Sequence, residues 1–192
     1  MEPGKLSRLQ QEVLDAFFER ETRFFLTGGA ALAGFMASLA EIARKFKASF
    51  EPIQTSPDFR RFLIRRGEEA VVVDLVRERG VQARIDKAVI NGIRVDPPEE
   101  ILANKLCTLL SRSELRDLVD VRALERAGYR VEVAIPSAMK KDGGLTPAQL
   151  GWVLSQIEIG DELTPPGGVS AVELRQYLID LIDRLTRLAY PT

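Results

Sequence analysis

The spacing of apolar residues predicts helices at both ends of the chain. Residues 6–20 and 36–47 carry apolar side chains three and four positions apart, which is the spacing of an amphipathic helix. Near the end of the chain, Ser170 and Glu173 form the pattern of a capping box, which predicts where the last helix begins. The apolar stripe of that helix comprises Leu174, Tyr177, Leu178, Leu181, Ile182, Leu185 and Leu188.

Between these helices the pattern changes to short strands. Residues 88–90 and 93–95 flank Asn91-Gly92, a dipeptide that supplies positive φ at both positions of a type I′ turn, so we expect a hairpin there. Three further strands are predicted at 48–53, 61–64 and 70–77.

The third of these strands contains one acidic residue among valines. Strand alternation places Asp74 on the same face as Val72 and Val76, and the other apolar residues on the opposite face. A carboxylate is costly to bury without a partner, so Asp74 either lies at an open sheet face or binds a cation.

Prolines and small polar residues punctuate a helical second half. Pro97-Pro98 ends the strand region and begins a helix predicted over 98–111. Ser113 is a good N-cap residue, so we predict a second helix from there to Ala127.

Two more features divide the rest of the chain. Residues 131–144 end in Lys-Lys-Asp-Gly-Gly, which is typical of a loop or linker. Thr146-Pro147 places an N-cap before a proline and predicts a helix through residue 157. We therefore expect a strand-rich core over 1–96 and a helical domain over 97–192 that completes a cleft.

Composition narrows the possible chemistry. The 192 residues include 27 Lys and Arg against 28 Asp and Glu, so net charge favours no nucleic-acid role by itself. There is no histidine, which excludes histidine bases, Ser-His and Cys-His pairs and imidazole zinc sites. The single cysteine, Cys107, allows no internal disulfide, and no apolar run has membrane-spanning length. We expect a cytoplasmic protein whose chemistry uses carboxylates, lysines, backbone amides or a metal.

A glycine turn near the start suggests phosphate binding. An apolar segment over 24–26 stops at Thr27-Gly28-Gly29, and a small-residue stretch follows over 30–35. A strand, a tight turn and a helix start in this order bring bare amides up to a phosphate. The alternative is a turn that only connects two elements.

Three charged residues in the second half are candidates for a site. Lys105 lies within the apolar arc of its predicted helix, where it either reaches solvent at the edge or places a cation in a cleft. Asp117 and Asp120 lie three apart on the next helix and so face the same way. Their repulsion requires a cation, for which Arg116, Arg122 and Lys105 are candidates, and Asp117 has a structural or a catalytic role.

A run of arginines is the best candidate for RNA contact. Arg60, Arg61, Arg65 and Arg66 surround an aromatic residue, Phe62, and the alternative is an ordinary solvated face.

Taken together, these motifs resemble the nucleotidyltransferase-like toxins of the AbiEii family, over about residues 23–124. The family pattern is a glycine turn, an arginine and an Asp-x-Asp metal pair, an acidic strand, a Lys-Leu helix and an Arg-Asp-x-x-Asp helix. The matching positions are Gly28, Gly29, Asp74, Lys105, Leu106, Arg116, Asp117 and Asp120.

The resemblance implies an α+β fold, with a nucleotidyltransferase-like mixed sheet, flanking helices and a helical C-terminal half. It also implies transfer of a nucleotide from an NTP to RNA, such as tRNA, with Mg²⁺, by a toxin that a partner antitoxin neutralises. Thr27, Gly28, Gly29 and Lys105 would then bind the nucleotide. Asp74 would hold the metal, and Asp74 and Asp117 would serve the metal or the attacking hydroxyl.

One part of the family pattern has no counterpart. After Phe35 the chain passes directly into the helix that begins at Met36, where an arginine and the Asp-x-Asp pair are expected. Either the pair is lost and the protein is an inactive binding or regulatory module, or a segment is missing from the sequence between these two residues. A non-catalytic interaction protein that binds a partner through its C-terminal helices is the other alternative.

Overall fold

A computed structural model describes residues 6–20, 36–76, 82, 86–90 and 93–191. Two compact units are present, one formed by 1–79 with 86–96 and the other by 80–85 with 97–192. The described elements of the first unit are α1 (Arg8–Arg20), α2 (Met36–Lys45), β1 (Ser49–Thr55), β2 (Phe59–Arg66), β3 (Glu69–Val76), β4 (Ala88–Ile90) and β5 (Ile93–Val95). The described helices and strands occur in separate blocks along the chain, two helices, then five strands, then further helices, which confirms the α+β class.

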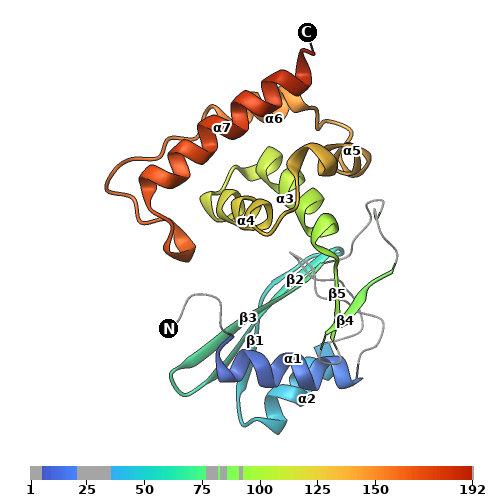
Figure 1. Ribbon diagram of the computed structural model, residues 1–192. Helices are drawn as coiled ribbons and strands as arrows, with labels where there is room; N and C mark the ends of the chain where they lie inside the picture. Colours follow the sequence, from blue (N-terminus) through green and yellow to red (C-terminus); the bar gives the residue numbers. More distant parts are fainter. Residues whose placement is uncertain (1–5, 21–35, 77–81, 83–85, 91–92, 192) are drawn as a thin grey trace. The chain divides into compact units, whose positions relative to one another are not determined.

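The first unit is built on an antiparallel sheet in the order β1-β2-β3. One face of the sheet is apolar, and α1 and α2 pack on it side by side (Figure 1). Phe62 and Ile64 of β2 are fully buried there, whereas Val72 of β3 is 55% exposed on the opposite face. The alternation predicted for β3 is therefore confirmed, and Asp74 lies on the open face with Val72.

The predicted hairpin is confirmed as β4 and β5, which pair in antiparallel register from Ala88↔Val95 to Ile90↔Ile93. Its two ends are joined by a buried ion pair between Lys87 and Asp96, whose side chains are 6% and 1% exposed. The turn residues between the strands lie outside the described part of the chain.

The second unit is helical. Its elements are α3 (Pro98–Arg112), α4 (Leu115–Arg126), α5 (Val131–Lys141), α6 (Pro147–Leu154), the 3₁₀ turn η1 (Pro166–Gly168) and α7 (Ala171–Ala189). Helix α3 packs on α4, α5 and α6, and α6 packs on α7 (Figure 1). Gly151 of α6 faces α7, where a Cβ at this position would lie at ordinary contact distance, 3.6 Å, from the Leu185 Cβ.

Two predicted caps are confirmed in this unit. The Thr146 side chain accepts a hydrogen bond from the Gln149 backbone N–H and begins α6. The capping box of Ser170 and Glu173 is complete at the start of α7. Helix α6 ends at Leu154, before the predicted residue 157, because Ser155 already takes the C-cap position.

Two predictions for this unit were wrong. The expected loop over 131–144 is mostly helix α5, since Val131, Ala134, Ile135 and Ala138 bury one helical face despite Pro136 inside the helix. Ser113 does not cap α4. It closes α3 in the left-handed conformation, with φ of 50°, and the N-cap of α4 is Glu114.

Candidate functional site

The turn between α3 and α4 brings a lysine and a buried carboxylate together. Helix α3 ends at Arg112, two residues reverse the chain, and α4 begins at Leu115, so Asp117 in its first turn faces back toward α3. Lys105 Nζ lies 2.9 Å from Asp117 Oδ1. Asp117 is completely buried, which makes this ion pair a fixed part of the interface between the two helices.

A second cation binds the same carboxylate. Arg112 follows Lys105 by two helical turns and therefore lies on the same side of α3. Its Nε donates to Asp117 Oδ2 at 2.9 Å and its Nη2 donates to Oδ1 at 3.2 Å. Both oxygens of Asp117 are thus engaged by cations.

Asp120 adds a second carboxylate to Lys105. It lies one turn after Asp117 on α4, and its Oδ2 forms an ion pair with Lys105 Nζ. The Asp120 side chain is 50% exposed and the Lys105 side chain is 13% exposed. The ammonium therefore lies between one buried carboxylate and one that reaches solvent.

The pKa shifts in the cluster follow from burial and charge acting against each other. Burial alone would lower the pKa of Lys105, but the hydrogen bonds and charges of Asp120 and Asp117 outweigh it and raise the pKa. Burial alone would raise the pKa of Asp117, but Arg112 and Lys105 outweigh it and lower the pKa. Both groups are charged at neutral pH.

Of the three cations expected to relieve the two aspartates, the structure uses only Lys105. Arg116 pairs with Glu114, at 2.6 Å, and Arg122 pairs with Glu173, at 3.4 Å. The sequence reasoning missed Arg112. Its place two turns after Lys105 and five residues before Asp117, across a tight connection, was the signal that could have found it.

Asp74 lies in the other unit and already has a cation partner. Its Oδ1 and Oδ2 accept from Arg61 Nε and Nη2 at 2.7 and 2.8 Å, in the bidentate geometry of an arginine-carboxylate pair. Arg61 is directly opposite Asp74 in the β2-β3 register and also lies 5.4 Å from the centre of the Phe59 ring. Two residues expected to contact different ligands therefore contact each other.

The arginine run is divided by strand alternation. Arg61 and Arg65 share the open face of the sheet, whereas Arg60 and Arg66 share the face that packs on α1 and α2. Arg66 pairs with Glu12 of α1 and with Glu69. Arg65 is the exposed member of the run.

Thr27, Gly28 and Gly29 lie outside the described residues. The predicted cleft that combines this turn with Lys105 is therefore not described either.

The residues described do not fit a magnesium site. Magnesium in proteins is held by carboxylates, water and substrate phosphates, and Asp74 has both oxygens bound by a guanidinium. In the described segments no three Asp, Glu, Cys or His side chains gather in a group that could hold a metal ion.

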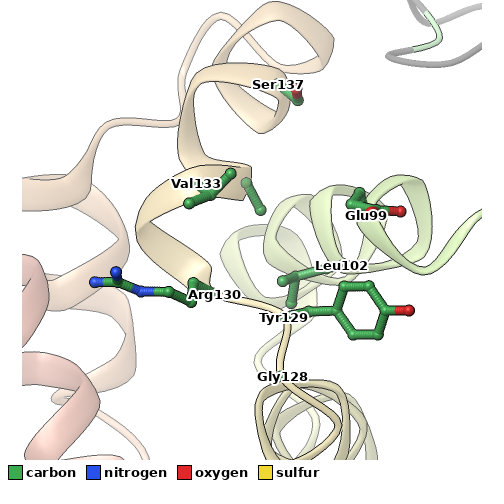
Figure 2. A pocket seen from close by; sticks show the side chains of 8 residues that line it. Glu99, Leu102, Gly128, Tyr129, Arg130, Val133 and Ser137 are labelled. Atoms are coloured by element: carbon green, nitrogen blue, oxygen red, sulfur yellow. The ribbon is translucent and has the colours of Figure 1, made fainter.

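A pocket of about 370 Å³ lies elsewhere in the helical unit, between α3 and α5. Its lining includes Tyr129 and Arg130, whose side chains extend in opposite directions (Figure 2). The polar groups of this pocket do not converge on a common point, so the Lys105 cluster is the better candidate site.

Across the residues that the structure describes, no helix has both the length and the apolar character to cross a membrane. Comparisons with curated proteins and with solved structures gave no match. The family model described as "Nucleotidyl transferase AbiEii toxin, Type IV TA system" matches residues 40–184, which include β1 to β3 and the Lys105 cluster. The chain belongs to the AbiEii family of nucleotidyltransferase toxins of type IV toxin-antitoxin systems.

Proposed function

We propose that this protein transfers a nucleotide from an NTP to an RNA, such as a tRNA, and that an antitoxin protein neutralises it. The observation that supports this most directly is the Lys105 ammonium, which a buried carboxylate holds on one side and a half-exposed one on the other. A lysine that is kept charged and reaches solvent through an exchangeable partner suits the binding of phosphate oxygens. The cytoplasm, where NTP and tRNA occur, is the proposed location.

In this proposal Lys105 contacts the triphosphate. Nucleotide binding by Thr27, Gly28 and Gly29 stays a prediction from the sequence, because these residues lie outside the described part of the chain. Positive charge near the phosphates favours transfer because negative charge builds up on the phosphate oxygens in the transition state. Asp117 acts through Lys105. Its complete burial and its two occupied oxygens favour positioning over proton abstraction from the acceptor.

RNA contact is proposed at the arginines of the sheet. Arg65 is the strongest member, because it is exposed and lies beside Arg61 on the open face. Arg60 and Arg66 lie on the face that packs on the helices, so any contribution from them would act through the sheet rather than by direct contact.

A transfer assay with a labelled NTP and purified tRNA tests the proposal. The wild-type chain, Lys105→Ala and Lys140→Ala are compared, because Lys140 is an exposed lysine on α5 and its removal changes the net charge equally. Loss of most label transfer in Lys105→Ala alone, with an unchanged circular dichroism spectrum, is the expected result. Equal transfer by Lys105→Ala would remove this lysine from the site.

A second function is favoured by one observation, the bidentate pair of Arg61 and Asp74. A chain whose strand carboxylate is committed to arginine is suited to be an inactive binding or regulatory module of the same toxin family. Isothermal titration with NTP separates the two functions. The transferase binds NTP through Lys105, whereas the interaction module binds a partner protein and needs no nucleotide.

A further inference from the structure

The two carboxylates on Lys105 differ in how readily they can leave it. Asp117 is completely buried and also binds Arg112. Separating it from Lys105 would leave a buried carboxylate with too few cation partners, which is costly. Asp120 is half exposed and forms an ion pair with Lys105. An ion pair of this exposure contributes only about 0.2–1 kcal/mol.

Both carboxylates approach the ammonium from α4. Residues three apart on a helix lie on one face, so both can reach Lys105. Because Asp117 is completely buried and Asp120 is half exposed, Asp117 lies on the buried side of Lys105 and Asp120 on the side toward solvent. A ligand that reaches Lys105 from solvent therefore meets Asp120 first. Because both are anionic, an incoming phosphate and the Asp120 carboxylate compete for the same ammonium protons.

The charges of the cluster indicate which anions can win this competition. Lys105, Arg112 and Arg116 are paired with Asp117, Asp120 and Glu114, so these six groups together are neutral and the site has no net attraction for an anion. When Asp120 turns to solvent, the three cations, Asp117 and Glu114 leave one net positive charge at the site. A polyphosphate gains more from that charge than a single carboxylate does, since Coulomb attraction scales with the charge of the ligand.

We propose that Asp120 is a displaceable occupant of the phosphate site at Lys105, and that polyphosphate binding exchanges it for a phosphate oxygen while Asp117 stays in place. This rests on the proposed role of Lys105 in binding nucleotide phosphates. Asp120 then weakens binding of the ligand and keeps the ammonium paired when the site is empty. Asp117 has the opposite effect, because it fixes the ammonium where the phosphate arrives.

Binding of inorganic triphosphate, measured by isothermal titration in the presence of EDTA, tests the exchange without magnesium or transfer activity. Asp120→Asn should bind triphosphate about tenfold more tightly than wild type, because the competing charge is gone and the shape is kept. Asp183→Asn is the matched control. Asp183 is also a half-exposed helical aspartate in an ion pair, with Arg187 on α7, and its change should leave the affinity unaltered.

Each result distinguishes the exchange from the function on which it rests. Unchanged or weaker binding by Asp120→Asn, with wild type binding normally, would overturn the exchange and leave the role of Lys105 intact. Absence of binding in wild type and in both variants would overturn both. Lys105→Met should abolish binding in the wild-type and in the Asp120→Asn background, and thermal melts check that each variant is folded.

Discussion

The Lys105 ammonium and the Asp117 carboxylate form an ion pair across the reversal between α3 and α4, with 2.9 Å between Nζ and Oδ1 and no part of Asp117 exposed. This pair joins the chemistry of the site to the stability of the helical unit. The same carboxylate that positions the ammonium also holds Arg112 at the end of α3. Changes at these residues therefore affect both ligand binding and folding, and experiments must separate the two.

Asp117→Asn should destabilise the protein by about 1–3 kcal/mol, because it removes the charge that Lys105 and Arg112 share in a buried position. Asp120→Asn should cost less than about 1 kcal/mol, since its side chain is half exposed. Urea unfolding of the two variants measures both values. Equal destabilisation would show that burial does not distinguish the two carboxylates.

The stability should also depend on pH through Asp117. Because its pKa is lowered in the folded state, its ionised form stabilises the fold, and this stabilisation is fully present above the unfolded pKa of about 4. It is lost as the pH falls below that value through the folded pKa. Thermal melts from neutral to acidic pH should show a smaller loss of Tm in Asp117→Asn than in wild type. If Tm falls equally steeply with pH in both proteins, other carboxylates, such as Glu125, dominate the loss of stability in acid.

A second network should stabilise the helical unit independently of the site. Arg184 of α7 donates to both oxygens of Glu125, at 2.8 and 2.6 Å, and to Glu132 at 2.9 Å. Tyr177 donates to the same Glu125 at 2.7 Å. These contacts lower the pKa of Glu125 despite its burial, so the carboxylate is charged and depends on its partners.

Arg184→Met should therefore destabilise the protein by about 1–3 kcal/mol, because it leaves two carboxylates with less compensation. The control is Arg187→Met, three residues after Arg184 on α7, at an arginine whose side chain is 72% exposed and pairs with Asp183. That change should cost less than about 0.5 kcal/mol in urea unfolding. A larger effect at Arg187 than at Arg184 would contradict the assignment of the network.

Much of the fold follows from periodicity, whereas α5 required tertiary information. The strand alternation around Asp74, the hairpin and the two helix caps depend on local spacing and turn chemistry, and these were predicted correctly. Helix α5 was missed because the Lys-Lys-Asp-Gly-Gly sequence that ends residues 131–144 is typical of a loop. The burial of Val131 and Ala138 against α3 overrides that local preference.

The candidate site was predictable only in part. Lys105 with Asp117 and Asp120 followed from the short connection between two helices, but the partnership of Arg61 with Asp74 depends on the register of β2 and β3. Register is set by which face is buried and by turn geometry, so no single strand determines it. Ser113 was misassigned because helix α3 extends one residue beyond its predicted end at residue 111. Ser113 is therefore the C-cap of α3 and not the N-cap of the next helix.

Pro136→Ala should stabilise the protein by about 1–2 kcal/mol. Proline in the helix interior removes the hydrogen bond to the carbonyl of Glu132 and crowds it, and alanine restores the bond at an exposed position. Pro147→Ala is the matched control, because a proline at the first position of a helix costs no hydrogen bond. Thermal melts compare the two. A loss of stability in Pro136→Ala would mean that rigidity of the unfolded chain outweighs the missing bond.

The last prediction concerns magnesium and the pair of Arg61 and Asp74. Since Arg61 occupies both oxygens of the carboxylate, Mg²⁺ should bind the protein weakly in the absence of nucleotide. Arg61→Met frees Asp74 and should increase the Mg²⁺-dependent rise in Tm, whereas Arg65→Met, at an exposed arginine of the same strand, should not. Tight Mg²⁺ binding by wild type that Asp74→Asn abolishes would show that the ion displaces Arg61. Tight binding that survives Asp74→Asn would instead place the metal site on other carboxylates of the chain.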